Sequence, residues 1–194
     1  MEAPVDIPTE VPTVVITAAR LPLATGEQTF SLIRLNSGEL VEPLRLDEIL
    51  GQTPGAALFR RTTSIAANPT IQGISLRNIA PSGAGRALVT LDGVPQNDPF
   101  GGWVIWSALP AEGLSGVTIV RGSGAGPYGA GALTGVIGLE EHGQTDGVAA
   151  AGASITDTVS GRAAASVGFG GFLFTGSVES GDGYVPVRGA GRGA

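Results

Sequence analysis

Glycines crowd one segment of the chain, residues 117–139, where they lie between two short apolar runs. Gly124, Gly126 and Gly129 follow the spacing G-x-G-x-x-G directly after a predicted strand, which is the context of a dinucleotide-binding turn. A phosphate site of that kind needs a helix after the turn, and Pro127 with the glycines that follow would disrupt such a helix. The chain also has no lysine, so it holds no phosphate loop ending in Gly-Lys. Turns and close backbone packing between β-strands explain these glycines better.

The composition favours β-structure punctuated by glycine over a helical bundle, because 32 of the 194 residues are glycine and only 14% are charged. The net charge is −6 and the 11 basic residues are scattered arginines, which argues against a nucleic-acid partner. The absence of cysteine removes disulfides, thiolate nucleophiles and cysteine metal sites. His142 is the only histidine, and a polar turn beside Glu140 and Glu141 explains it better than a metal or catalytic site. We therefore expect no catalytic residues, no metal site and no cofactor.

The N-terminal region carries no targeting signal that the sequence makes visible. No run of about 18 apolar residues is present, and the first residues have neither the basic nor the apolar region of a signal peptide. Residues 1–29 contain four prolines around a β-branched run at residues 13–17, which predicts an extended arm. The run is either a free hydrogen-bonding edge or an ordinary edge strand, and its periodicity leaves both open.

The middle of the chain predicts short strands and a short helix. Strands are expected at residues 31–35 and 87–91, further short extended pieces at 59–61 and 71–76, and an amphipathic helix at 44–50. Asp92-Gly93 is a strong turn signal directly after residue 91. The loop at residues 95–106 then holds both tryptophans beside amides and a carboxylate, which suits either recognition of a small ligand or burial of the two indoles.

From residue 147 onward the sequence alternates with period two. Val159, Ala163 and Val167 share one face of a predicted strand, whereas Ser160 and Arg162 face the other way. This pattern is typical of transmembrane β-barrel strands and equally of a soluble antiparallel sheet. On these residues alone the soluble sheet is the slightly better interpretation, because alanine-rich outer faces are poorly lipophilic.

Four motifs follow one another along the chain. Glu10 and the run at residues 13–18 come first, and Leu46-Asp47-Glu48-Ile49-Leu50 with Pro54-Gly55 comes second. Residues 71–77 together with residues 86–95, which include the turn Leu91-Asp92-Gly93-Val94, form the third motif. The glycine-rich segment is the fourth, with Val120-Arg121-Gly122, Tyr128-Gly129 and Gly135-Val136-Ile137.

In this order the motifs resemble the plug domain of TonB-dependent outer-membrane receptors followed by the first strands of their barrel. The first motif looks like a TonB box, the segment that such receptors offer to the energy-transducing protein TonB. Three positions depart from the family pattern: Asn78 stands where glycine is usual, Thr118 where glutamate is usual and Ser123 where proline is common.

The resemblance implies an α+β fold, with a small mixed-sheet plug domain and short helices followed by the first antiparallel strands of an incomplete transmembrane β-barrel. It divides the chain into an extended N-terminal arm with the TonB box (1–29), the plug domain (30–141) and the start of the barrel (142–194). Receptors of this kind close about 22 strands, and the chain has room for about three, so we expect a fragment of a longer protein.

The resemblance also implies a function, which is TonB-energised uptake of a scarce substrate such as a ferric siderophore or cobalamin across the cell outer membrane, without enzyme activity. The implied partners are the C-terminal domain of TonB, outer-membrane lipid and a small-molecule or metal-chelate substrate. The expected TonB-binding residues are Thr13, Val14, Val15, Ile16 and Thr17. The expected substrate-binding residues are Thr62, Thr63, Ser64, Asn68, Asn97, Asp98, Phe100 and Trp103. Arg77 and Arg121 are expected to contact barrel carboxylates, because a buried arginine needs a bidentate partner.

Two other classes stay open at this point. A secreted or surface-exposed β-rich protein used for binding or adhesion would place residues 1–29 in a folded sheet. A dinucleotide-binding oxidoreductase is less expected, and it would require a helix from Tyr128 onward together with a measurable affinity for NAD.

Overall fold

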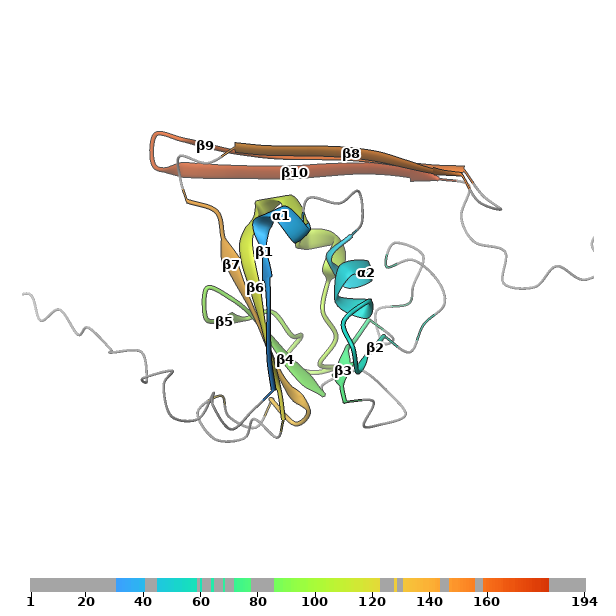
Figure 1. The fold of residues 1–194 in the computed structure, drawn as a ribbon, viewed down its shortest axis with the longest axis vertical. Coiled ribbons are helices and arrows are strands. Elements are labelled where there is room, and N and C mark those ends of the chain that lie inside the picture. Colours follow the sequence, from blue (N-terminus) through green and yellow to red (C-terminus); the bar gives the residue numbers. More distant parts are fainter. Residues whose placement is uncertain are drawn as a thin grey trace, which may run out of the picture.

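A mixed five-stranded sheet organises the N-terminal part of the chain in this computed structural model (Figure 1). The structure describes residues 31–40, 45–58, 60, 64, 68, 72–77, 86–122, 128, 131–143, 147–155 and 159–181. In the order of the sheet, the strands are β1 (Ser31–Asn36), β6 (Leu114–Arg121), β7 (Gly135–Glu141), β4 (Ala87–Leu91) and β5 (Val94–Pro95). Only β4 and β7 pair in parallel. We call the described residues 31–141 the sheet domain.

Short elements connect these strands and cover the sheet. They are the helices α1 (Ser37–Leu40) and α2 (Leu46–Gly51), the small antiparallel pair β2 (Ala56–Ala57) and β3 (Ser75–Leu76), and the 3-10 helices η3 (Trp106–Ala108) and η4 (Ala111–Gly113). The strands expected at residues 31–35 and 87–91 are confirmed, and the helix expected at 44–50 is confirmed as α2 at Leu46–Gly51. The strand at residues 71–76 shrinks to β3. Arg60 is not part of a strand, residues 59 and 61 lie outside the described residues, and the extended piece expected at residues 59–61 remains a prediction.

The turn between β4 and β5 is the one that its dipeptide predicts. Asp92 and Gly93 both have positive φ, 47° and 86°, and Leu91 pairs with Val94 across the turn. Two successive residues with positive φ define the type I′ turn, whose twist matches that of the flanking strands. The Asp-Gly sequence therefore determines this hairpin locally.

The hydrophobic core fills the space between the sheet and the short helices. Trp106 is the largest buried side chain, and its indole Nε1 donates a hydrogen bond of 2.7 Å to the carbonyl oxygen of Gln72. Trp103 is half-buried. Burial under the loop is thus the better explanation for one of the two indoles. The other large buried side chains of this core include Leu40, Leu46, Leu50, Ile74, Leu76, Ile119, Ile137 and Leu139.

Gly135, at the start of β7, shows why the glycine-rich segment cannot carry ordinary side chains throughout. Its φ is 147°, and a Cβ added there would lie 2.2 Å from the carbonyl oxygen of Val120 and 2.7 Å from Cδ1 of Leu76. The expected role of the glycines, close packing between strands, is confirmed at this position. Gly124, Gly126 and Gly129 lie outside the described residues.

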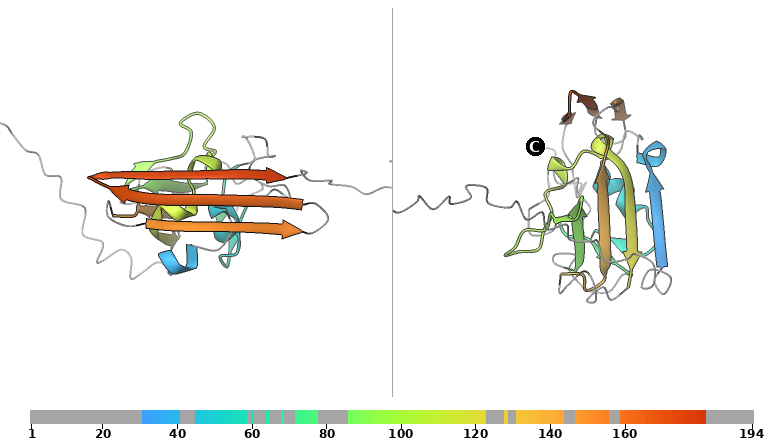
Figure 2. Two further views of the ribbon diagram at one scale, coloured as in Figure 1. Left: turned by 90° about the horizontal axis from the view of Figure 1, so that it is seen from above. Right: turned by 90° about the vertical axis from the view of Figure 1, so that its left-hand side faces the viewer.

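A second, three-stranded sheet lies across one end of the sheet domain, as Figure 1 shows and Figure 2 shows from above. It contains β8 (Gly147–Ile155), β9 (Val159–Phe169) and β10 (Phe172–Gly181), with β9 in the middle and both pairings antiparallel. We call these three strands the outer layer. The five-stranded sheet ends at Glu141, before the outer layer begins; the division of the chain at residue 141 remains a prediction.

The two faces of the outer layer are opposite to those of a soluble sheet. The apolar side chains of β9 and β10 point away from the sheet domain and are each more than half exposed; they are Val167, Phe169, Phe172, Phe174 and Val178. The polar face is turned toward the sheet domain, which covers Ser166 and most of Arg162 but leaves Thr175 and Ser177 of β10 exposed. A soluble sheet buries its apolar face, so the interpretation as a soluble sheet is wrong. An apolar outer face and a polar inner face are the pattern of barrel strands.

Within the described residues, no helix combines the length and the apolar character needed to cross a membrane.

Candidate functional site

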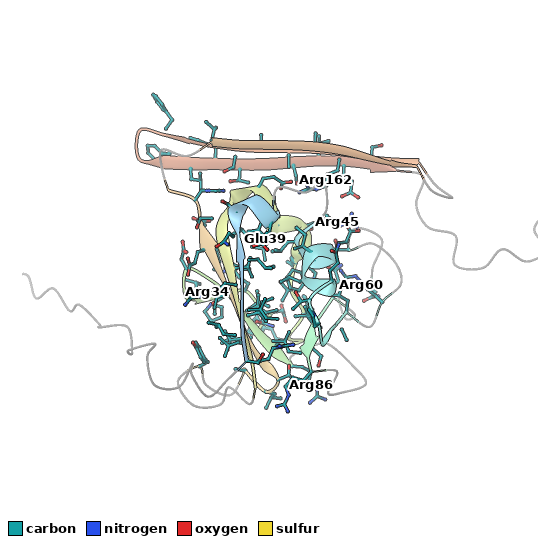
Figure 3. The ribbon with its side chains drawn as sticks, in the orientation of Figure 1. Arg34, Glu39, Arg45, Arg60, Arg86 and Arg162 are labelled. Atoms are coloured by element: carbon teal, nitrogen blue, oxygen red, sulfur yellow. The ribbon has the colours of Figure 1, made fainter. Side chains whose placement is uncertain are left out.

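Two ion pairs join the outer layer to the sheet domain. Arg45, just before α2, binds the carboxylate of Glu179 in β10 through Nη1. Arg162 in β9 binds both carboxylate oxygens of Glu112 in η4, with 2.7 Å between Nη2 and Oε2. Figure 3 shows Arg45 and Arg162 at this junction, one from each side. Each side of the interface therefore contributes one arginine and one carboxylate.

The start of α2 positions Arg45. The residue is the N-cap, and its backbone N–H donates to Oε2 of Glu48 at 3.1 Å, as in a capping box. Its guanidinium is also 2.6 Å from Oε1 of Glu48 and 3.5 Å from Oδ1 of Asp47. Burial alone would lower the pKa of Arg45, but the hydrogen bond to Glu179 and the negative charges of Glu48 and Asp47 raise it above its ordinary value. The side chain therefore stays charged at the interface.

Next to Arg45, Asp47 belongs to a buried polar cluster. The carboxylate of Asp47 accepts hydrogen bonds from Nη2 of Arg60 and, at 3.2 Å, from the hydroxyl of Ser64. All three side chains are almost completely buried. Because a buried carboxylate needs such partners, this cluster fixes α2 against the chain that follows it.

Glu112 in η4 is completely buried at the interface with the outer layer. Both of its carboxylate oxygens are bound by Arg162, which is the strong bidentate geometry. The same short helix also holds the end of β7, since the backbone N–H of His142 donates to the carbonyl oxygen of Gly113 at 3.0 Å. Thus η4 contacts both the outer layer and the segment that leads to it.

A small cavity of about 160 Å³ opens at this junction. It is lined by Arg45, Leu46, Trp106, Ser107, Leu109, Pro110, Arg162, Ser177 and Glu179. Sites for drug-sized ligands usually measure about 300–1,000 Å³, so the cavity is too small for such a ligand.

The expected substrate-binding residues on the loop after β5 have unequal roles. The side chain of Asn97 accepts from the N–H of Val89 at 2.7 Å and donates to the carbonyl oxygens of Ala87 and Gly102 at 3.1 Å each. Its amide is therefore occupied in supporting the edge of β4. Phe100, by contrast, is 97% exposed.

Asp98 and Trp103 shape the turn that presents Phe100. Oδ1 of Asp98 accepts from the backbone N–H groups of Phe100 and Gly101, at 2.9 and 2.7 Å. The Trp103 ring lies over Gly101, where an added Cβ would come within 1.7 Å of it. The loop is thus held by its own contacts while the Phe100 ring stays exposed.

The other expected substrate residues have different surroundings. Ser64 belongs to the buried Asp47 cluster, and Asn68 is exposed. Thr62 and Thr63 lie outside the described residues, as do the expected TonB-binding residues 13–17. Their roles stay predictions.

The two arginines expected to meet barrel carboxylates have other surroundings here. Arg121 donates to the carbonyl oxygen of Pro54 at 2.7 Å and from Nε to the hydroxyl of Ser31 at 3.2 Å. Ser31 begins β1, at the end of the sheet away from the outer layer (Figure 1). Arg77 is exposed and has a φ of 65°. A contact of either arginine with barrel carboxylates elsewhere remains a prediction.

The sequence alone did not identify Arg45, Glu112, Arg162 and Glu179 as the residues that join the two parts. One signal was present, since Arg162 and Glu179 are charged residues on the polar faces of predicted strands. The register places them directly opposite each other on β9 and β10.

The structure rules out the helix that a nucleotide site would need. Tyr128 lies in a turn, the described residues 131–134 are not helical, and β7 begins at Gly135, so the described residues do not form the helix that such a site requires. The interpretation of the glycine-rich segment as part of an oxidoreductase is therefore wrong.

Together these features define a class of protein. A small mixed-sheet domain is docked on the polar face of strands whose apolar face is exposed, which is the arrangement of a plug against the wall of a β-barrel. The family model described as TonB-dependent Receptor Plug Domain matches residues 37–136, just over half of the chain. The chain belongs to this family of TonB-dependent receptor plug domains.

Solved structures share the fold. The unliganded ferric citrate transporter FecA aligns with a TM-score of 0.57 and 18% identity, over 79% of this chain and 26% of that one. The alcaligin outer membrane receptor FauA from Bordetella pertussis gives 0.54 and 18%, over 79% and 27%. A variant of the ferric enterobactin receptor PfeA from Pseudomonas aeruginosa, in complex with enterobactin, gives 0.53 and 16%, over 80% and 25%. The chain thus spans about a quarter of the length of these proteins. No curated protein matches it.

Proposed function

We propose that the chain is the plug-containing part of an outer-membrane receptor that takes up a scarce substrate with energy supplied through TonB. The observation that carries the proposal is the plug fold docked on the polar face of the outer layer, whose opposite face is apolar and exposed. Lipid of the outer membrane would cover this apolar face.

The proposed substrate is a ferric siderophore, cobalamin or a similar scarce compound. Similar structures support the ferric class, because their names refer to ferric citrate, alcaligin and ferric enterobactin. Only similarity of fold supports this substrate class, since the sequence identities are 18% or lower.

Residues 13–17 are proposed to bind the C-terminal domain of TonB as an added β-strand. The β-branched side chains of Thr13, Val14, Val15, Ile16 and Thr17 favour extended backbone. Strand addition relies on backbone hydrogen bonds, so it tolerates many side chains but not a proline at a position whose N–H is bonded.

The proposed function is tested by Val15→Pro in the full-length receptor. We expect this change to abolish TonB-dependent uptake of the ferric substrate and to leave substrate binding at the cell surface unchanged, because only the added strand is interrupted. Val15→Thr is the matched control, since it keeps the N–H and the β-branched shape, and it should transport normally. Uptake by the proline variant at the rate of the unchanged receptor would contradict the proposal.

Phe100 is proposed to contact the substrate, with Asn97 supporting the loop. Phe100→Ala should weaken substrate binding and change the free energy of unfolding by no more than about 0.5 kcal/mol, because the ring is exposed. Asn97→Ala should lower that free energy by about 1–3 kcal/mol, because it leaves the Val89 N–H and a carbonyl oxygen without partners. Binding titrations and urea unfolding measure both effects. Unchanged binding by Phe100→Ala would remove Phe100 from the site.

A further inference from the structure

A buried carboxylate in α2 binds two points of the chain that follows the helix. Oδ2 of Asp47 accepts from Nη2 of Arg60, and Oδ1 accepts from the hydroxyl of Ser64 at 3.2 Å. Figure 3 shows Arg60 beside α2. Ser64 and the exposed Asn68 are two of the expected substrate-binding residues. We call residues 60–68 the first segment, which Asp47 anchors at positions 60 and 64.

Arg60 depends on this carboxylate to compensate its charge. Its side chain is 2% exposed, and within the part of the chain that the structure describes its Nε and Nη1 have no hydrogen-bond partner. Without Asp47 the guanidinium would be a buried charge without compensation, which is strongly unfavourable. Arg60 would then leave its position, and the first segment would lose this anchor. The neighbouring Arg45 is different, because it also pairs with Glu48 and Glu179.

Gln72 joins the first segment to the loop at residues 95–106. Its side-chain Nε2 donates to the carbonyl oxygen of Ser64 at 2.8 Å. Its own carbonyl oxygen accepts from the N–H of Val104 at 3.3 Å and from the indole of Trp106 at 2.7 Å. One residue therefore connects two stretches of chain that each contain expected substrate-binding residues.

The contact with Val104 places Gln72 next to the turn that presents Phe100. Val104 forms an isolated antiparallel β-bridge with Asn97, which closes this turn, and the Phe100 ring within it is exposed. Groups that are held by packed and hydrogen-bonded neighbours lose less freedom when a ligand binds, so such support raises affinity. The contacts of Gln72 therefore determine how the turn lies relative to the first segment.

We propose that Asp47 and Gln72 are positioning residues of the substrate site, which fix the first segment against the loop that carries Phe100. Neither side chain contacts the substrate in this role, since Asp47 is 1% exposed and the amide of Gln72 is bonded to the backbone of Ser64. This inference rests on the proposed function, because it assigns the two residues to binding of the same substrate.

Substrate binding to the full-length receptor on cells without an energy supply tests the proposal. The probes are ferric citrate and ferric enterobactin, each labelled with radioactive iron. We expect Asp47→Asn and Gln72→Leu each to raise the Kd of the bound probe by about tenfold and to leave the number of binding sites unchanged, because each breaks one anchor of the first segment. Binding by either variant as tight as that of the unchanged receptor would overturn the proposal.

Two controls separate positioning from loss of a charge and from loss of stability. Glu48→Gln removes a neighbouring carboxylate of α2 that pairs with Arg45 and should bind the probe normally. Arg162→Met should destabilise the sheet domain by leaving Glu112 without its partner, but it touches neither the first segment nor the loop at residues 95–106, so its Kd should stay unchanged. A tenfold weakening by either control would show that any loss of charge or stability lowers affinity, and would overturn the proposal.

Amide hydrogen exchange of the receptor tests the anchors without any substrate. We expect Asp47→Asn and Gln72→Leu to speed exchange in the first segment by about tenfold or more, and Glu48→Gln to leave it unchanged. Unchanged exchange there in the first two variants would overturn the proposal even if neither probe is bound. Binding of neither probe by the unchanged receptor would count against the proposed function itself, while exchange would still decide whether Asp47 and Gln72 fix the first segment.

Discussion

Arg162→Met is expected to lower the free energy of unfolding by about 3–5 kcal/mol, because it leaves the completely buried Glu112 carboxylate without a partner. The methionine keeps much of the apolar volume of the arginine stem, so the loss reports mainly the charge. Urea unfolding of the chain in detergent micelles, followed by the fluorescence of buried Trp106, measures it.

A double variant provides the control. Arg162→Met combined with Glu112→Leu replaces the whole pair by apolar side chains, and a buried ion pair replaced in this way often costs little or nothing. The double variant should therefore be clearly more stable than Arg162→Met alone. A loss below about 1 kcal/mol in the single variant would show that Glu112 finds water or another donor when Arg162 is absent.

Gly135→Ala is the other substitution with a large expected effect, a loss of about 2–4 kcal/mol in the free energy of unfolding. The added methyl group would lie 2.2 Å from the carbonyl oxygen of Val120, and the φ of 147° is one that side chains rarely adopt. Relief of this clash requires β6 and β7 to separate at a pair that the register joins, Val120 with Val136.

Gly138→Ala in the same strand is the matched control for this prediction. A Cβ at Gly138 meets its nearest atoms at 3.8 Å, which is ordinary van der Waals contact. The same urea titration should therefore show little change for Gly138→Ala. Equal losses for the two glycines would mean that general loss of glycine flexibility, rather than the clash at Gly135, controls stability.

Local sequence signals predicted the elements that depend on local physics. The Asp92-Gly93 dipeptide identified its hairpin because positive φ at two successive residues is a property of those residues. The alternation in residues 159–167 identified β9 for the same reason, since the side-chain period of a strand is two.

Which of the two faces is exposed could not be predicted in the same way. Periodicity separates two faces but does not say which face meets solvent, so alanine-rich faces favoured a soluble sheet. The polar face of β9 became identifiable only when Arg162 had a buried carboxylate opposite it, 50 residues away along the chain. The pair between Arg45 and Glu179 spans 134 residues and has no local signal at all.

For the loop at residues 95–106, too, the sequence could not separate residues that bind a ligand from residues that support the fold. Asn97 and Phe100 both lie in the loop at residues 95–106, which the sequence assigned to recognition or to burial. A side-chain amide binds a ligand or the backbone depending on which backbone groups the fold leaves without a strand partner nearby. Beside Asn97, such groups are the N–H of Val89 and the carbonyl oxygen of Ala87, both in β4. The Asn97 side chain is used in backbone hydrogen bonds, whereas the Phe100 ring is exposed and can contact a ligand.

The pairing of β1 with β6 has a consequence for the timing of folding. Ser31 and Arg121, which meet at one end of that pair, are 90 residues apart in sequence, and β4 pairs in parallel with the still later β7. Strands joined over such long separations fold slowly, because the loop must close before the contacts can form. The first strand of the sheet therefore has no partner until β6 has been synthesised, so the five-stranded sheet can assemble only after most of the domain is present.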